Sequence, residues 1–296
     1  MSAPQTPPGD GSRAPQTPPG GLPFDIAGLS YAYPGAAEAA LDRVDFAVSE
    51  GEFVAVVGPN GSGKSTLARI LGGLETPSGT ERALSCGHDL LSAEGRMLAR
   101  RDVGVLFQNP ENQLVAECVE EDVAFGLENL GWEAPAMLSR VDEMLERFGL
   151  VELRLREPHL LSGGQKQRTA LAGVLAVPRR ALVLDEPTAM LDPAGRLEVL
   201  EVVSALRAGG LTVVFVTQEM DEVVGADRVL ALEGGRVAYD GSVDGLFADL
   251  GLLSRLRLGL PPSAAVALAL SSSVEPGAAA LPLTLDDLVH RLRERR

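Results

Sequence analysis

Apolar residues follow two patterns along this chain. Short continuous apolar runs, several of them rich in β-branched residues, are typical of strands buried on both faces of a sheet. These runs lie at 53–57, 103–107, 181–184 and 211–217. Helical spacing appears between them, as in 137–148, whose predicted packing face consists of Leu138, Val141, Leu145 and Phe148. The alternation of the two patterns predicts an α/β fold with a mainly parallel core sheet.

Weaker strand patterns flank these runs. The segments 25–33 and 44–48 precede the first buried run, and the segments 228–232 and 236–239 are separated by two glycines, as in a hairpin. We therefore expect an antiparallel β subdomain beside the core sheet. The segment from about 110 to 176 is predicted to form a helical subdomain within the α/β scaffold.

The sequence divides into three predicted regions. Residues 1–22 contain APQTPPG twice and few large apolar residues, so that burial cannot offset the entropy of ordering, and a disordered Pro/Gly-rich tail is predicted. Residues 23–240 are predicted to form one domain, and 241–296 a helical C-terminal extension. The extension is predicted to hold one amphipathic helix near 246–258. Its last helix carries an apolar stripe that needs a surface to cover, formed by Leu285, Leu288, Val289 and Leu292.

Composition and charge limit the classes of function that this sequence can have. The net charge of −15 disfavours a general binder of nucleic acid or anionic membranes, because phosphates repel such a surface. Cys86 and Cys118 have no paired spacing, so neither a zinc site nor a disulfide framework is predicted, and a reducing cytosol is expected. The sequence shows no signal peptide and no apolar run long enough to cross a bilayer. Any membrane role is therefore expected to depend on a partner.

The segment GPNGSGKST follows the run 53–57 and precedes a helix-like stretch, which is the context of a phosphate-binding loop. Its glycines allow backbone N–H groups to surround phosphates, and the following helix adds the positive end of its dipole. Lys64 can reach the β- and γ-phosphates, and the Ser65 hydroxyl can bind Mg²⁺. The residues predicted to bind the nucleotide here are Gly58, Pro59, Asn60, Gly61, Ser62, Gly63, Lys64, Ser65 and Thr66.

A second anion site is predicted at LSGGQKQR, residues 161–168. Ser162 is a good helix N-cap, and the glycines after it expose the N–H groups of the helix start. One subunit does not need two phosphate sites this far apart in sequence. One explanation is that each of them completes a site on a different copy.

Polar residues end the buried runs. Asp185 is placed to hold Mg²⁺ directly or through water, and Glu186 can orient and polarise an attacking water. Gln108 ends the run 103–107, where side chains commonly face the ligand crevice of an α/β sheet. Asp192 precedes a helix that is expected to start near Pro193.

Two features have open interpretations. Tyr33 stands ahead of the phosphate loop, so it could stack on a nucleotide base or pack on the sheet as an edge-strand tyrosine. The helical stretch 117–130 contains Glu117, Glu120, Glu121 and Asp122. These carboxylates form either a solvated helix face or an acidic surface on which a basic partner helix docks.

In this order, the motifs resemble those of the nucleotide-binding subunit of an ABC transporter, over roughly residues 23–240. The resemblance implies ATP and Mg²⁺ as cofactors, and a dimer in which each ATP lies between the phosphate loop of one subunit and the signature of the other. The signature residues are Leu161, Ser162, Gly163, Gly164 and Gln165. By the same resemblance, Tyr33 stacks on the base, Glu186 is the hydrolytic glutamate, and Asp192 is a dimer contact. The implied Mg²⁺ ligands are Ser65, Asp185 and Gln108, of which Gln108 also contacts ATP and connects the site to the transporter.

A narrower resemblance depends on FQNPENQLVA at 107–116 and on the tail segments LGLPPSAAVALAL and PLTLDDLVHRL. These are similar to the ATPase of energy-coupling factor importers of the cobalt and vitamin type. The resemblance implies an ATPase, peripheral on the cytoplasmic face of the cell membrane, that powers uptake of a micronutrient as a translocase subunit. The implied partners are a second ATPase subunit, identical or paralogous, a transmembrane coupling protein and a substrate-capture membrane protein. The C-terminal extension would join the two ATPases.

Gln218 departs from the family pattern, which usually has a histidine that contacts the γ-phosphate after the strand ending at Thr217. Glutamine can donate a hydrogen bond but cannot become charged near neutral pH. Either turnover is slower, with Gln218 a weaker catalytic residue, or it is unaffected because Glu186 dominates. The alternative function is a soluble ABC-type ATPase that acts on nucleic acid or ribosomes, or as a regulatory switch. Such proteins tend to carry a long coiled-coil insert or two motif sets, and the sequence contains neither.

Overall fold

The computed structural model describes residues 21–270 and 281–294. The predicted disordered tail therefore lies almost entirely outside the described residues. The predicted domain limits at 22/23, 110–176 and 240/241 remain predictions.

The core of the molecule is a six-stranded sheet in the order β10-β9-β3-β8-β7-β6, in which all neighbours are parallel except β9 and β10. Its strands are β3 (Phe53–Val57), β6 (Val103–Leu106), β7 (Ala181–Asp185), β8 (Thr212–Val216), β9 (Arg228–Glu233) and β10 (Arg236–Gly241). Every residue of β3, β7 and β8 is buried, which explains their continuous apolar runs. The predicted mainly parallel sheet is confirmed.

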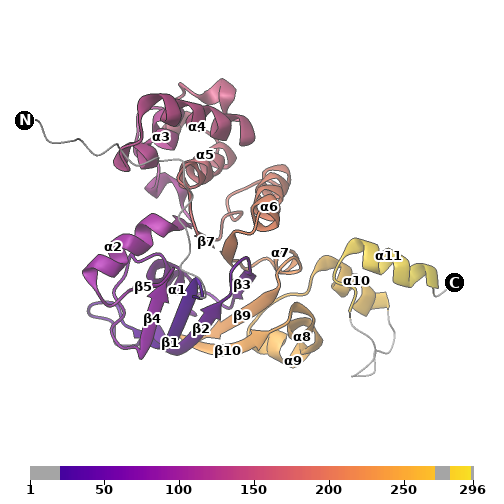
Figure 1. Ribbon diagram of the computed structural model, residues 1–296. Helices are drawn as coiled ribbons and strands as arrows, with labels where there is room; N and C mark the ends of the chain where they lie inside the picture. The colour runs from indigo at the N-terminus through magenta and orange to yellow at the C-terminus, as the bar shows by residue number, and fades with distance from the viewer. Residues whose placement is uncertain (1–20, 271–280, 295–296) are drawn as a thin grey trace, which may run out of the picture.

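A second, antiparallel sheet has the order β2-β1-β4-β5. It consists of β1 (Phe24–Tyr31), β2 (Leu41–Val48), β4 (Arg82–Ser85) and β5 (His88–Asp89). The helix α1 (Lys64–Leu71) shares one hydrophobic core with both sheets, in which Leu67 and Ile70 lie with Phe24 and Val54. The phosphate-loop helix is therefore held between the two sheets, near the lower part of Figure 1.

The helices α3, α4 and α5 gather at the opposite end of the molecule from β1 and β2 (Figure 1). The elements of this segment are η1 (Pro110–Asn112), α3 (Val119–Asn129), α4 (Ala134–Arg147), η2 (Val151–Leu153), η3 (Pro158–Leu160) and α5 (Gly163–Ala176). A second core joins them to the parallel sheet through residues such as Val141, Leu145 and Leu171. The predicted packing face was wrong at Leu138, which is 56% exposed, because the helix turns Met144 and Met137 toward the core together with the other three positions.

Along the sequence, the remaining helices lie between strands or after the last strand, β10. They are α2 (Ala93–Asp102), α6 (Pro193–Ala208), α7 (Met220–Val223), α8 (Val243–Ala248), α9 (Leu250–Arg255), α10 (Pro262–Leu270) and α11 (Leu285–Glu294). The single helix predicted near 246–258 was wrong. Asp249 ends α8, and its side chain accepts a hydrogen bond from the N–H of Leu252 at 2.8 Å, which starts α9. No helix within 21–270 or 281–294 is long and apolar enough to span a membrane.

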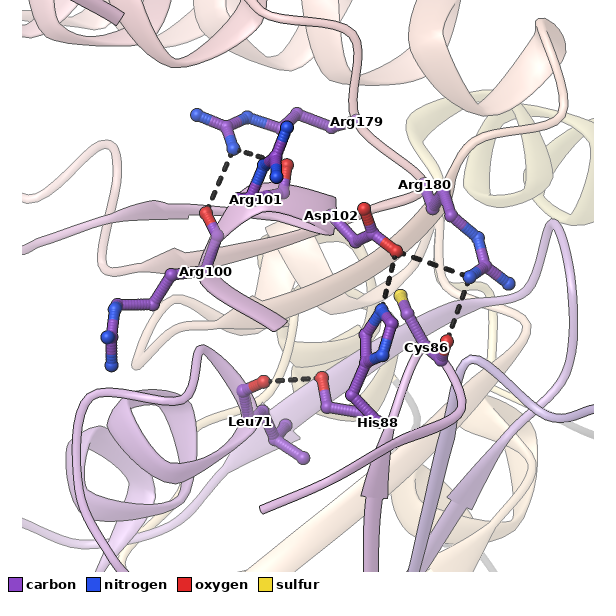
Figure 2. Close-up of polar contacts among 9 residues, drawn as sticks. Leu71, Cys86, His88, Arg100, Arg101, Asp102, Arg179 and Arg180 are labelled. Carbon is purple, nitrogen blue, oxygen red and sulfur yellow. Dashed lines mark hydrogen bonds and ion pairs between the residues drawn. The ribbon is translucent and has the colours of Figure 1, made fainter. Parts of the chain in front are cut away.

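A polar cluster joins the two sheets at the amino ends of β6 and β7 (Figure 2). Asp102 Oδ2 lies 2.9 Å from His88 Nε2 and 3.3 Å from Arg180 Nη1, and Arg180 also donates to the carbonyl oxygen of Cys86 at 2.8 Å. Burial raises the pKa of the Cys86 thiol to about 12, so the thiol stays protonated. Because the strands are parallel, this cluster lies at the edge of the sheet opposite to the loops that follow β3 and β7.

Candidate nucleotide-binding site

The candidate site forms at one edge of the parallel sheet. The loops that follow β3, β6, β7 and β8 carry, in that order, the phosphate loop, Gln108, Glu186 and Gln218. Because these strands are parallel and adjacent, their carboxyl ends meet at this edge. Residues far apart in the sequence are brought together there.

The phosphate loop has a backbone that only glycine accommodates at two of its positions. Gly58 and Gly63 have φ values of 142° and 103°. A Cβ atom at Gly58 would lie 2.2 Å from the carbonyl oxygen of Leu232, and one at Gly63 would lie 2.5 Å from that of Ala40. No side chain caps the start of α1. Its first N–H groups thus remain available to an anion.

Lys64 is the cation of this loop. It is 5% exposed, and its Nζ atom donates to the carbonyl oxygens of Gly58 at 2.8 Å and Pro59 at 3.1 Å. Burial lowers the pKa of Lys64, while the charges of Glu186 and Asp185 act in the opposite direction. A buried ammonium with only carbonyl partners is well suited to bind a phosphate oxygen.

The residues Asp185 and Ser65 fit a magnesium ion. Asp185 is buried at the end of β7, and its Oδ1 atom has no hydrogen-bond partner among the residues that the structure describes. Burial raises the pKa of Asp185, and a hydrogen bond from Ser65 lowers it. Within the described ranges, no three His, Cys, Asp or Glu side chains cluster as a metal site. Mg²⁺ in nucleotide sites needs only one or two carboxylates besides phosphate oxygens and water.

Glu186 is held by two amide side chains. Its Oε2 atom accepts a hydrogen bond from Gln108 Nε2 at 2.7 Å, and its Oε1 atom accepts one from Gln218 Nε2 at 2.6 Å. Gln218 Nε2 also donates to Asn60 Oδ1 in the phosphate loop at 2.9 Å. Glu186 itself has a φ of 49°, in the left-handed region that non-glycine residues rarely adopt. The structure thus brings all three predicted residues to the phosphate loop.

Tyr33 lies beyond the end of β1, beside the start of α1. Its hydroxyl is 3.2 Å from Thr66 Oγ1, and its ring packs edge-on against Tyr31 at a centroid distance of 5.0 Å. The residue as a whole is 37% exposed. It therefore has a free surface next to the phosphate loop, as a base-stacking residue requires.

The signature segment lies with Asp192. Ser162 and Gln165 form a capping box at the start of α5, with hydrogen bonds of 3.3 and 2.9 Å, so the predicted N-cap is confirmed. A Cβ atom at Gly163 would lie 3.2 Å from the carbonyl oxygen of Met190, just before Asp192, which caps α6. Among the described residues, no hydrogen bond or ion pair joins 161–165 to the phosphate loop of the same chain.

Gln113 is a positioning residue that the sequence did not single out. Its Oε1 atom accepts from the N–H of Phe107 at 2.8 Å, and its Nε2 atom donates to the carbonyl oxygen of Val105 at 2.9 Å. The side chain thereby fixes the loop that carries Gln108. Its signal in the sequence was the stretch FQNPENQLVA at 107–116, which contains it.

Comparisons with known proteins agree with this geometry. A family model described as ABC transporter matches residues 41–189. The energy-coupling factor transporter ATP-binding protein EcfA1 of Symbiobacterium thermophilum is 51% identical over 282 residues, which cover 91% of this chain and 96% of that protein. EcfA1 of Clostridium novyi is 42% identical over 254 residues, covering 86% and 90%.

Two solved structures share the fold. One is cbiO1 from Clostridium perfringens, described as part of the ABC transporter complex cbiONQ, with a TM-score of 0.69 and 35% identity, covering 81% of this chain and 96% of that one. The other is the dimeric ATP-binding cassette MJ0796 bound to ADP and Pi, with a TM-score of 0.69 and 28% identity, covering 74% and 98%. This chain therefore belongs to the ABC transporter family, among the ATP-binding proteins of energy-coupling factor transporters.

Proposed function

We propose that this ATP-hydrolysing transport subunit closes each ATP between its own phosphate loop and the signature of a second ATPase subunit, identical or paralogous. The observation that carries the proposal is the position of the signature, which is capped but, among the described residues, forms no hydrogen bond or ion pair with the phosphate loop of its own chain. A relative of the same fold is described as dimeric with ADP and Pi bound, which supports a shared site.

The residues divide the chemistry between them. Lys64 and the N–H groups at the start of α1 bind the phosphates, and Tyr33 stacks on the base. Ser65 and Asp185, with Gln108, would hold Mg²⁺, which neutralises charge on the phosphate oxygens when bound. Glu186 orients the attacking water and accepts its proton, while Gln108 and Gln218 fix the carboxylate that does so.

The membrane partners are proposed from the surface near Gln108. A groove of about 270 Å³ lies between α3 and the parallel sheet, and its lining includes Phe107, Gln113 and the exposed Phe125. We assign this groove to a transmembrane coupling protein, because its occupant would contact the loop that carries Gln108. A substrate-capture protein beside the coupling protein would supply the micronutrient. The ATPase would then sit peripherally on the cytoplasmic face of the membrane.

The acidic side chains of α3 support this docking only in part. Glu120 pairs with Arg154 at 2.8 Å, and Asp122 Oδ1 accepts from the N–H groups of Val115 and Ala116. Glu120 and Asp122 therefore already interact with groups of their own chain. Glu117 and Glu121 line a separate open groove together with other residues of 114–118 and 155–159, and these two remain to meet a basic partner side chain.

Replacing Phe125 with glutamate is expected to release the ATPase from its membrane complex. An unpaired charge in an apolar contact costs more than about 1.4 kcal/mol, so the affinity should fall at least about tenfold. The measurement is recovery of the tagged chain with membrane proteins in mild detergent. Met97→Glu on α2 is the matched control, since Met97 is 51% exposed against 49% for Phe125 but lies outside the groove. Equal recovery of both variants would contradict the assigned groove.

Gln218→Ala is expected to slow ATP hydrolysis at least about tenfold, because one of the two amides that hold Glu186 is lost. Gln218→His should keep the donor and add a pH dependence, since an imidazole becomes charged below a pH of about 6.5. Steady-state rates from pH 5.5 to 8.5 test both. A rate for Gln218→Ala equal to that of the unsubstituted chain would instead mean that Glu186 acts without this support.

A further inference from the structure

We infer that Glu222 is a positioning residue that holds together three segments: the loop that carries Glu186 and Asp192, the loop that carries Gln218, and the first turn of α6. The inference deepens the proposed function and rests on it, because those three residues have roles only in the composite ATP site. Glu222 belongs to α7, near where α6 and α7 meet at the carboxyl edge of the sheet (Figure 1).

The Glu222 side chain is fully buried, with 0% of its surface exposed, and both of its oxygens accept hydrogen bonds. Oε1 accepts from Thr188 Oγ1 at 2.6 Å and from Arg196 Nε at 2.8 Å, and Oε2 accepts from the Thr217 hydroxyl. Each donor belongs to a different loop or helix. Thr188 follows Glu186 by two residues, Thr217 directly precedes Gln218, and Arg196 follows Asp192 by four.

Arg196 connects this carboxylate to the start of α6. Besides Glu222, its guanidinium pairs with Asp221 at 2.8 Å and with Glu219 at 3.6 Å. Arg196 stands in the first turn of α6, whose N-cap is Asp192. The orientation of that turn, and with it of the loop that faces the signature, therefore depends on a guanidinium fixed by α7.

Thr217 connects the Glu222 carboxylate to Gln218, whose side chain holds Glu186. Its hydroxyl donates to Glu222 and accepts from the N–H of Glu219 at 3.0 Å, which closes the loop around Gln218. The amide of Gln218, one residue away, bonds to Glu186 and Asn60. A displacement of Thr217 would therefore move one of the two donors that orient the hydrolytic carboxylate.

Glu222 acts mainly by fixing the positions of these loops. Its ion pair with Arg196 contributes little to the free energy of unfolding, because a buried ion pair adds little net stability compared with an apolar pair of the same size. Within the described part of the chain, the hydrogen-bond partners of Glu222 are Thr188, Arg196 and Thr217, and none of them belongs to the phosphate loop. That loop has a backbone contact of its own, the hydrogen bond from the N–H of Gly235 to the carbonyl oxygen of Ser62 at 3.1 Å, and Gln218 bonds to it through the Asn60 side chain. Loss of the Glu222 contacts should thus reduce the catalytic step and leave ATP affinity nearly unchanged.

The test measures kcat and KM for ATP with the full chain in its transporter complex. Glu222→Gln keeps the shape but replaces one acceptor oxygen with a donor. We expect kcat to fall at least about tenfold while KM changes less than about threefold. Thr217→Val, which removes one donor, should have the same effect, and Thr217→Ser should restore kcat. These Thr217 variants also keep the inference testable if Glu222→Gln does not fold.

Arg207→Ala is the matched control at the other end of α6. Arg207 donates to the carbonyl oxygen of Gly225 at 2.7 Å and pairs with Asp227, so its loss should lower the Tm without lowering kcat. The inference is overturned if Glu222→Gln and Thr217→Val lower the Tm alone, or raise KM in parallel. A fall in kcat for Arg207→Ala as large as theirs overturns it too. The proposed function fails separately, if Glu186→Gln keeps turnover.

Discussion

Replacing Lys64 with alanine is expected to abolish ATP binding, so that no hydrolysis is measurable. The Lys64 ammonium is buried, within 3.1 Å of two backbone carbonyl oxygens of the phosphate loop, and Asp185 and Glu186 are close enough to influence its pKa. Without this cation, those carboxylates would face the phosphates uncompensated. Removing one partner of a buried charge pair costs about 2–5 kcal/mol, and each 1.4 kcal/mol weakens binding tenfold.

The measurement is the ATP-dependent rise in Tm, together with direct titration of a fluorescent ATP analogue. Arg69→Ala is the matched control, because Arg69 lies on the same helix but is half-exposed, and its one ion pair within the described residues is with Glu75 at 4.0 Å. It removes the same charge and should bind ATP almost as the unsubstituted chain does. If Lys64→Ala still gains stability from ATP to the same degree as Arg69→Ala, the role of Lys64 is wrong.

The fold was predictable where burial leaves a simple pattern. The strands at 53–57 and 181–185 are buried on both faces, so their sequences are continuously apolar. Helix α2 escaped prediction because among its ten residues only Gly95 and Ala99 are buried, which leaves no apolar stripe. The helix expected near 246–258 was divided by Asp249, whose capping bond outweighs the helical spacing of the leucines around it.

The site was predictable residue by residue but not as an arrangement. The phosphate loop and the signature are contiguous in sequence, so local chemistry identified them. The hydrogen bonds that hold Glu186 come from Gln108, 78 positions away, and from Gln218, 32 positions away. Gln218 also bonds to Asn60, which is 158 positions away in the sequence. Contacts between residues this far apart depend on the order of the strands in the sheet, and the pattern of apolar residues in the sequence does not reveal that order. The buried contacts of Glu222 remained hidden for the same reason.

The soluble, non-transport ATPase considered from the sequence is disfavoured by the relatives. The two relatives reported above, which match over 91% and 86% of the chain, are described as ATP-binding proteins of energy-coupling factor transporters. The net charge of −15 also opposes a nucleic-acid partner. Transport thus agrees with the relatives, and the charge disfavours the nucleic-acid alternative.

Glu186→Gln is expected to keep ATP binding while turnover falls at least about a hundredfold, since general-base catalysis contributes about 10²–10⁴. Glutamine has the shape of glutamate and the same strain at a φ of 49°, so the loop should keep its path. Its amide cannot accept the proton of the attacking water. ATP should then persist in the composite site, and the closed dimer should accumulate, which size-exclusion chromatography with ATP and hydrolysis rates together measure.

A substitution of the neighbouring carboxylate, Asp185, distinguishes the proposed role of Glu186 in water activation from a role in metal binding. Asp185→Asn changes the buried oxygen that lacks a partner in the chain, so it should weaken Mg²⁺-dependent ATP binding itself and prevent the dimer from accumulating. Two adjacent substitutions of the same chemical type would thus give opposite results for ATP retention. Turnover in Glu186→Gln near that of the unsubstituted chain would move the base to another residue. Equal loss of ATP binding in both variants would make Glu186 part of the binding site, because the loss of a water-activating base does not by itself weaken ATP binding.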